Sequence, residues 1–275
     1  MDTRGEDTRG TGTRDEESGI RGGGGKRNGG RDEESGIRGG GGERNGGRDE
    51  ESGIRGGGGE RNGGRDEDGY GAASPLGRQA WRWFEDFLCR PHAEIGREGH
   101  VCPFVGPAIG AGTLRVEEWE TGPEPGAEEL TALVHRMADT FEHTQWAGRN
   151  RTLHALVVVL NGLAASALPQ MDEAHRRAKP QLVRRYLMLG QFHPACDERA
   201  ARNPELPVSR APVPMFALRN MAFHDVLFLD ENPEWFRAYA ERFGRRYTSA
   251  ASLPDPLFAD RYARAREKWL AGCGA

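Results

Sequence analysis

The stretch Leu-His-Ala-Leu-Val-Val-Val-Leu, residues 153–160, decides the fold class, because it is an apolar run with three β-branched residues. Such a run is typical of a central strand with both faces covered by other elements. Residues 187–192 and 213–221 also have the pattern of strands, and residues 113–119 alternate like a half-exposed strand. The sequence therefore predicts a sheet built around residues 153–160.

Helical patterns flank these strands along the chain. Ser74-Pro75 is a helix start, with Ser as N-cap and Pro in the first turn, and this helix should end near Arg90 because the residue before Pro91 avoids the helical region. Helices and strands alternate without a strict βαβ rhythm, so we predict an α+β domain with a mixed, mainly antiparallel sheet flanked by helices. The other predicted helices are 128–143, 169–186 with an interruption at Pro180, 233–243 and 256–271.

A glycine-rich repeat precedes this domain. The seventeen residues RDEESGIRGGGGKRNGG at 14–30 return at 31–47 and 48–64 with a single change, Glu for Lys26. One Ile in each copy cannot supply the apolar stripe that stacked repeats share, so ordering would not offset its conformational entropy. We therefore predict a disordered tail over 1–71 and a single α+β domain over 72–275.

The charge and cysteine content of the chain limit the partners and the cellular compartment that we expect. Residues 1–71 hold 13 basic and 17 acidic residues, and the rest of the chain holds 25 of each. A neutral domain gives no electrostatic reason to expect nucleic acid or a membrane surface. The Arg-Gly-Gly units of the tail are similar to RNA-binding segments, but the tail is net acidic and Tyr70 is its one aromatic residue. Irregular cysteine spacing, together with no apolar transmembrane stretch or signal-peptide pattern, favours a cytoplasmic protein with reduced thiols.

Two residues are candidates for chemistry because each precedes a proline within apolar sequence. Cys102 lies in Val-Cys-Pro-Phe, and His193 follows a strand-like run in Gly-Gln-Phe-His-Pro. They could present a thiolate and an imidazole to an apolar cavity, which suits haem or another flat cofactor. The alternatives are an inert buried cysteine and a structural histidine that caps a loop carbonyl.

Two further groups of polar residues are ambiguous. His224-Asp225 invites comparison with metal-binding His-Asp pairs, but no second His and distal Asp follow at a recognisable spacing, so Asp225 is expected to orient His224 or to cap a turn. Four arginines near the His193 segment could hold propionates, a carboxylate or a phosphate, or could belong to a solvated, salt-bridged loop. They are Arg199, Arg202, Arg210 and Arg219.

Three sequence blocks carry a resemblance to a known family. They are Cys-Pro-Phe-Val at 102–105, Gly-Gln-Phe-His-Pro at 190–194 and Pro-Val-Pro-Met at 212–215. With the order of elements around them, over roughly residues 80–245, the chain resembles the YqcI/YcgG family and a related group of uncharacterised bacterial domains. Some YqcI/YcgG proteins are haem-dependent oxygenases that hydroxylate a guanidine or amine nitrogen in natural-product pathways.

The resemblance implies a haem-dependent oxidoreductase, with N-oxygenation of a small amine or guanidine in specialised metabolism as its reaction. His193 would then be the iron ligand, Cys102 a second candidate ligand or pocket residue, and Arg210 or Arg219 an anchor for a propionate. The alternative is a non-catalytic protein on the same fold that binds a small acid or acts as an accessory protein. In the haem hypothesis the pocket is lined by Phe104, Phe192, Met215 and Phe216.

Overall fold

The structure is a computed structural model that describes residues 74–248, 253 and 255–270. The chain divides into two units, residues 1–58 and 59–275, and all described residues belong to the second. The tail predicted for residues 1–71 lies outside the described residues.

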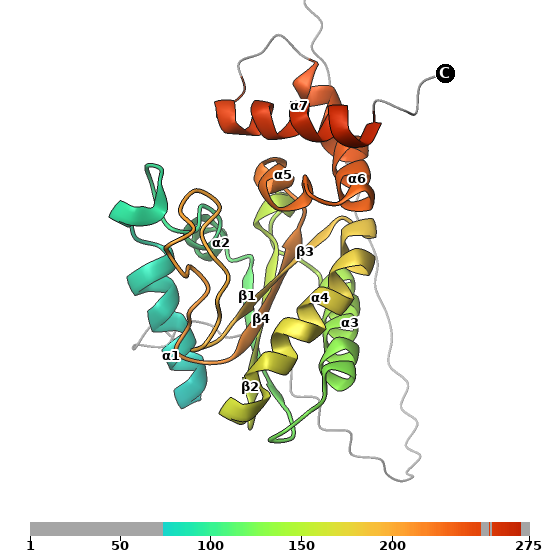
Figure 1. Cartoon of the computed structure of the whole chain (residues 1–275). Helices are drawn as coiled ribbons and strands as arrows, with labels where there is room; N and C mark the ends of the chain where they lie inside the picture. Colours follow the sequence, from blue (N-terminus) through green and yellow to red (C-terminus); the bar gives the residue numbers. More distant parts are fainter. Residues whose placement is uncertain (1–73, 249–252, 254, 271–275) are drawn as a thin grey trace, which may run out of the picture. The chain divides into compact units, whose positions relative to one another are not determined.

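The described residues contain a four-stranded sheet in the order β1-β2-β4-β3 (Figure 1). β1 runs parallel to β2, whereas β4 is antiparallel to both of its neighbours, β2 and β3. The predicted α+β class with a mixed, mainly antiparallel sheet is therefore confirmed. The strands are β1 (Leu114–Glu120), β2 (Ala155–Asn161), β3 (Leu187–Phe192) and β4 (Met215–Asn220).

The apolar run at 153–160 forms β2, as its pattern predicts. Residues 156–160 are all buried, because the strand lies between two neighbours and both of its faces are covered. Its residues alternate between two core clusters: Leu156, Val158 and Leu160 face one layer, and Val157 and Val159 face the other. β2 therefore separates the two apolar layers of the domain.

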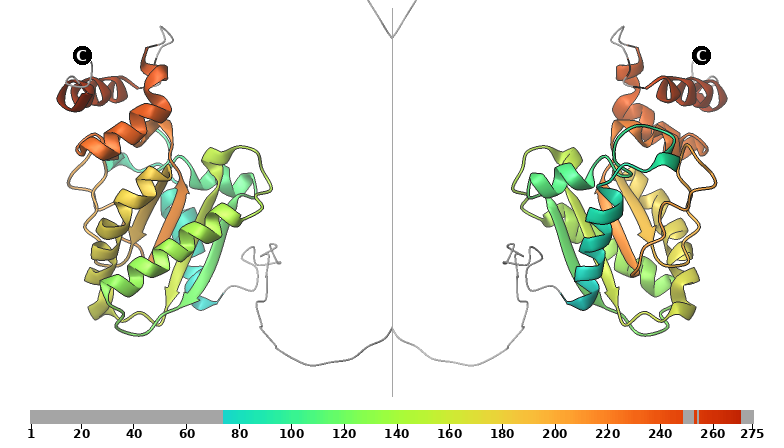
Figure 2. Two further views of the ribbon diagram at one scale, coloured as in Figure 1. Left: turned by 90° about the vertical axis from the view of Figure 1, so that its right-hand side faces the viewer. Right: turned by 90° about the vertical axis from the view of Figure 1, so that its left-hand side faces the viewer.

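Helices α3 (Ala127–His143) and α4 (Leu168–Arg184) cover one face of the sheet (Figure 2). α4 continues through Pro180, so the interruption predicted there is absent. A proline inside a helix costs about 3 kcal/mol. Here that cost is offset by packing on both sides of the proline, since Ala174, Ala178 and Leu182 are all fully buried against the sheet.

The opposite face is covered by α1 (Pro75–Trp83), a π-helical turn η1 (Phe84–Leu88), α2 (Val105–Gly110) and the loop of residues 195–213 (Figures 1 and 2). Ser74 caps α1 as predicted, because its Oγ accepts hydrogen bonds from the backbone N–H groups of Leu76 and Gly77. A 3-10 turn, η2 (Ala93–Ile95), lies in the segment between η1 and α2.

The C-terminal elements form a further cluster at one end of the sheet (Figure 1). They begin with the 3-10 turn η5 (Phe223–Asp225), which directly follows β4. The hydroxyl of Tyr239 bonds to the Phe223 carbonyl at 2.5 Å and to the Tyr247 hydroxyl at 2.6 Å, which fixes this turn. The other elements are α5 (Val226–Leu229), α6 (Pro233–Phe243), η6 (Gly244–Tyr247) and α7 (Pro256–Leu270).

Two short 3-10 turns, η3 (Arg151–Leu153) and η4 (Ala165–Ala167), flank β2. Among the described residues, every helix is too short or too polar to cross a membrane.

Candidate functional site

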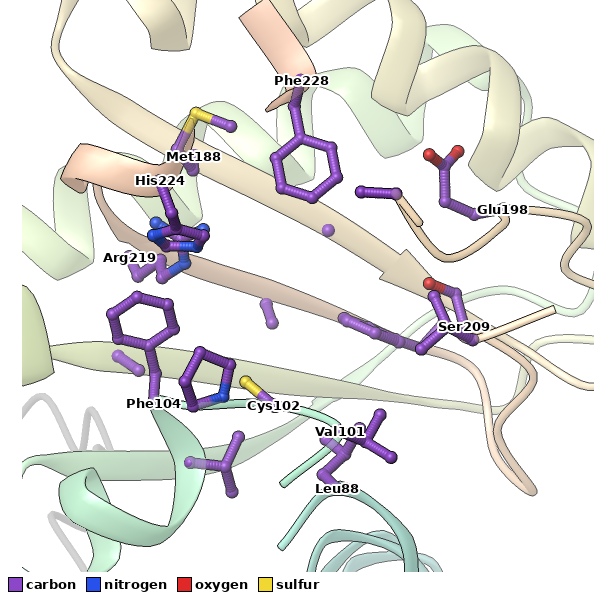
Figure 3. Close-up of a pocket in the computed structure, with 18 of the residues that line it drawn as sticks. Leu88, Val101, Cys102, Phe104, Met188, Glu198, Ser209, Arg219, His224 and Phe228 are labelled. Atoms are coloured by element: carbon purple, nitrogen blue, oxygen red, sulfur yellow. The ribbon is translucent and has the colours of Figure 1, made fainter. Parts of the chain in front are cut away.

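An apolar cavity of about 760 Å³ lies between the sheet and the layer that contains η1, α2 and the loop of residues 195–213 (Figure 3). Its walls include Phe84 and Leu88 from η1 and Val101 and Cys102 from the segment before α2. This volume is within the range of sites that enclose a drug-sized or cofactor-sized ligand, roughly 300–1,000 Å³.

The sheet forms the floor of this cavity, where small residues stand at the centre of β3 and β4. Ala217 of β4 pairs with Gly190 of β3 on one side and with Val157 of β2 on the other, and all three line the cavity. A Cβ atom at Gly190 would lie only 2.9 Å from the ring of Phe192. The ring of Phe192 thus occupies the space beside Gly190, and the small side chain of Ala217 leaves space for the cavity.

Polar and aromatic groups gather at one end of the cavity, where Figure 3 shows Phe104, Arg219 and His224 close together. The rings of Phe104 and His224 lie 4.6 Å apart, and the guanidinium of Arg219 lies 4.8 Å from the centre of the Phe104 ring. Phe104 precedes α2, Arg219 is in β4 and His224 is in η5. Segments distant in sequence thus combine to hold one imidazole at the cavity wall.

A buried carboxylate supports this end of the cavity. Asp225 is fully buried, accepts two hydrogen bonds from Arg219 at 2.8 and 2.7 Å, and accepts a third from the backbone N–H of Ala222 at 2.7 Å. Burial disfavours its charged form, but Arg219 outweighs burial and lowers the pKa of Asp225 below its usual value. Asp225 is therefore a carboxylate, and its Oδ1 lies 3.4 Å from Nε2 of His224.

His224 is neutral at physiological pH, since burial, reinforced by the charges of Arg219 and Arg97, lowers its pKa to about 4. Its Nδ1 makes no hydrogen bond within the described part of the chain. A neutral imidazole with a free ring nitrogen can act as a metal ligand or accept a hydrogen bond from a bound molecule. The sequence signal for this residue is the His224-Asp225 pair directly after a strand.

The structure brings together five of the residues predicted from sequence. All of them line the cavity, although they come from three separate segments of the chain: Cys102, Phe104, Phe192, Met215 and Arg219.

Three other predicted residues are not among those that line the cavity. Phe216 follows Met215 on β4 and points to the opposite face, where it packs with the α3 and α4 layer. His193 follows Phe192, is 1 % exposed, and hydrogen-bonds through Nε2 to Oδ1 of Asp172 on α4 at 3.0 Å. Arg210 lies in the loop and pairs with Asp197.

The four arginines of the sequence prediction all have carboxylate partners. Arg199 and Arg210 share Asp197, at 3.2 and 3.0 Å, Arg202 pairs with Asp255, and Arg219 pairs with Asp225. Arg199 and Arg210 thus have the arrangement of a salt-bridged loop, whereas Arg219 belongs to β4. Each of these charges is already partly neutralised within the protein.

Two other cations of the lining have no carboxylate within ion-pair distance in residues 74–248, 253 and 255–270. Arg97 donates to the backbone carbonyls of Glu98 and Val101 at 2.9 and 2.8 Å, and its charge remains available to a ligand. Lys179 of α4 lines the cavity where it reaches the edge strand β3, and burial lowers its pKa. The cavity therefore offers an apolar interior with positive charge on its wall.

Comparison with known proteins gives one match. A family model described as DUF6875, a domain of unknown function, matches residues 77–253, which include β1 to β4 and all the cavity-lining residues of β3 and β4. Neither a curated protein nor a solved structure matches the chain. Because the model matches more than half of the sequence, the chain belongs to the DUF6875 family.

Proposed function

We propose that this protein binds haem in the apolar cavity and is a haem-dependent oxidoreductase that N-oxygenates a small amine or guanidine. One observation supports haem as the cofactor: His224, a neutral imidazole, lies at the wall of an apolar cavity of about 760 Å³. Imidazole and thiolate are both axial ligands that haem proteins use, and a metal binds imidazole only in its neutral form.

The side chains of the cavity fit haem in three respects. His224 would supply a nitrogen ligand to the iron, and Asp225, 3.4 Å from its Nε2, is the kind of carboxylate that orients a ligating histidine and raises its basicity. Aromatic and aliphatic residues such as Phe104, Phe192 and Met215 supply apolar surface for a flat macrocycle. Arg97, with no carboxylate partner among the described residues, supplies a charge for a propionate.

The reaction class rests on the resemblance to the YqcI/YcgG family through the blocks at 102–105, 190–194 and 212–215. When bound, haem would supply the oxygen and one-electron chemistry that side chains lack. N-hydroxylation inserts one oxygen atom of O₂ into an N–H bond and releases the other as water, with two electrons and two protons from an external donor. The apolar walls would exclude water from that chemistry.

The alternative is a non-catalytic protein that binds a small acid in the same cavity. Arg97 and Lys179 are the cations that favour it, because neither has a carboxylate partner among the described residues. The pairing of the four predicted arginines argues against it, since an acid would have to compete with Asp197, Asp225 and Asp255. The apolar lining gives the haem proposal the advantage.

Titration of the purified apoprotein with haemin tests the proposal. We expect stoichiometric uptake and a Soret band that survives gel filtration. Ala217→Leu should fill the floor of the cavity and abolish uptake, whereas Ala165→Leu, at an exposed position in η4, should leave it unchanged. If the protein takes up no haemin, the haem proposal is wrong and the acid-binding alternative stands. Uptake unaffected by Ala217→Leu would place haem elsewhere.

A further inference from the structure

A second group of metal-ligating side chains lies outside the apolar cavity, and the proposed function does not use it. Asp172 of α4, His193 and Cys196 each offer one ligand atom, and these three atoms lie within 4.8 Å of one another. Ligands about a tetrahedral zinc ion are separated by roughly 3.5 Å, given metal–ligand distances of 2.0 to 2.3 Å. Small side-chain adjustments would therefore bring the three atoms to bonding distance of one ion.

The chain after β3 brings two of these ligands together. His193, Pro194, Ala195 and Cys196 form a tight turn in which the backbone N–H of Cys196 donates to the carbonyl of His193 at 3.1 Å. The backbone N–H of Ala211 donates to the same carbonyl at 3.3 Å, so the far end of the loop fixes the turn. His193 and Cys196 are 1 % and 0 % exposed, which means that both side chains point into the protein.

The second ring nitrogen of His193 is available to a ligand. Nε2 of His193 donates to the carboxylate of Asp172 at 3.0 Å, because an ionised carboxylate only accepts. Nδ1 is then left as a bare lone pair, and it is buried with no hydrogen bond in the described structure. Native proteins rarely leave such an atom unsatisfied, and a histidine held by a carboxylate through one nitrogen commonly binds a metal through the other.

The surroundings of the cluster favour a cation. Asp172 has no arginine or lysine within ion-pair distance among the described residues, and its side chain is 43 % exposed. A second cavity of about 540 Å³ reaches Asp172, and its lining also includes Asp197, Glu198, Arg176 and Lys179. Of the nearby cations, Arg210 and Arg199 are paired with Asp197 and Arg176 is paired with Glu173, whereas Lys179, which also lines the second cavity, has no carboxylate partner among the described residues.

We propose that Asp172, His193 and Cys196 form a site for a zinc-like divalent transition metal ion, separate from the apolar cavity. Nitrogen and sulfur donors select zinc or a similar metal over calcium or magnesium. With the ion on Nδ1 of His193, Asp172 holds the imidazole through Nε2 and does not bind the ion itself. With the ion in place of the Nε2 proton, Asp172 binds it directly. Water would supply the remaining ligands. The ion would join α4 to the start of the loop of residues 195–213, part of which covers the apolar cavity.

A cysteine nucleophile activated by His193 and Asp172 is the rival use of the same residues. It is disfavoured because the Cys196 side chain is inaccessible to a substrate. Burial, together with Asp172, Asp197 and Glu198, also raises the pKa of the Cys196 thiol to about 11, so the uncharged thiol predominates until a metal binds.

Cobalt substitution tests the site in the full chain. We expect one equivalent of Co²⁺ to produce a thiolate-to-cobalt charge-transfer band that one equivalent of Zn²⁺ abolishes. The band should disappear in Cys196→Ser and persist in Cys89→Ser and Cys102→Ser, since Cys89 and Cys102 are the other described cysteines. Absence of the band in the natural protein, or its loss in the Cys102 variant instead, would overturn the proposal.

Two measurements remain decisive if Cys196→Ser fails to fold. Asp172→Asn changes a partly exposed residue and should weaken cobalt binding by about 10-fold to 100-fold. In the natural protein under partial denaturation, Zn²⁺ should protect Cys196 from alkylation more than it protects Cys89, as read by peptide mass spectrometry. Unchanged cobalt affinity in Asp172→Asn, or equal alkylation of the two cysteines with and without Zn²⁺, would contradict the site.

Discussion

Arg219 and Asp225 form an ion pair through two hydrogen bonds, 2.8 and 2.7 Å long, at the end of the cavity where His224 lies. Asp225 is fully buried, so removal of its carboxylate would leave the Arg219 charge without a partner in an apolar environment. We expect Asp225→Ala to lower the free energy of unfolding by about 3–5 kcal/mol in urea denaturation. Asp197→Ala, which removes a carboxylate that is 75 % exposed, should cost less than about 1 kcal/mol. Similar effects of the two substitutions would show that the pair does not organise this end of the cavity.

Stability should fall on acidification because two histidines are held neutral. Burial lowers the pKa of both His175 and His224 to about 4, below their ordinary value of 6.5. The unfolded chain therefore binds more protons between pH 6.5 and pH 4, and the stabilisation, fully present above pH 6.5, is lost as the pH falls through that window. Each histidine should lower the free energy of unfolding by up to about 2 kcal/mol when the pH falls from 7 to 5.

Urea denaturation at both pH values measures this loss. His224→Asn should reduce the difference between pH 7 and pH 5, whereas His100→Gln, at an exposed position, should not. The account fails at this point if the natural protein is equally stable at the two pH values.

Tyr239 should contribute to the position of His224 through the turn η5. Its hydroxyl bonds to the carbonyl of Phe223, the residue before His224, and to the hydroxyl of Tyr247. Tyr239→Phe leaves that carbonyl without its buried partner, so we expect the free energy of unfolding, measured by heat or urea, to fall by about 1–2 kcal/mol. Haemin binding should also weaken. Tyr262→Phe is the matched control, because Tyr262 stacks on Tyr247 at 3.8 Å but its hydroxyl has no hydrogen bond in the described structure. Equal losses in the two variants would show that the hydrogen bonds of the Tyr239 hydroxyl do not stabilise the turn.

Cys102 should be a wall residue of the cavity and not the axial ligand. It is a half-buried free thiol beside Pro103. Cys102→Ser should therefore cost about 1 kcal/mol, because it places a hydroxyl among apolar groups, and should leave the haem spectrum of the natural protein in place. A thiolate-type spectrum that disappears in this variant would transfer the ligand role from His224 to Cys102.

The sequence was sufficient for the fold class because the decisive signals are local. The apolar run at 153–160 predicts a covered central strand, and Ser74-Pro75 predicts the start of α1, which the hydrogen bonds of Ser74 confirm. Pro180 is the exception: the local preference predicts an interruption, but burial of Ala178 and Leu182 on either side keeps α4 continuous. Tertiary packing outweighs propensity at that position.

The candidate site was only partly predictable from the sequence. One rule accounts for two residues, His193 and Phe216, that were predicted at the haem site but do not line the cavity. Successive residues of a strand point to opposite faces, so Phe192 and His193, like Met215 and Phe216, are expected on opposite faces of the sheet. Applied strictly, this alternation places Phe192 and Met215 in the cavity and His193 and Phe216 on the other face. The approach of Phe104 to His224 depends on packing between distant segments, which no local pattern reports.

The most direct test of the haem proposal is the Soret spectrum of the haemin-loaded His224→Ala variant before and after addition of free imidazole. Alanine removes the proposed iron ligand and leaves a space at the cavity wall that imidazole can occupy, so we predict loss or displacement of the Soret band and its partial recovery with imidazole. His193→Ala, on the other face of the sheet, should keep the spectrum of the natural protein. An unaltered spectrum in His224→Ala, or imidazole rescue confined to His193→Ala, would contradict the account.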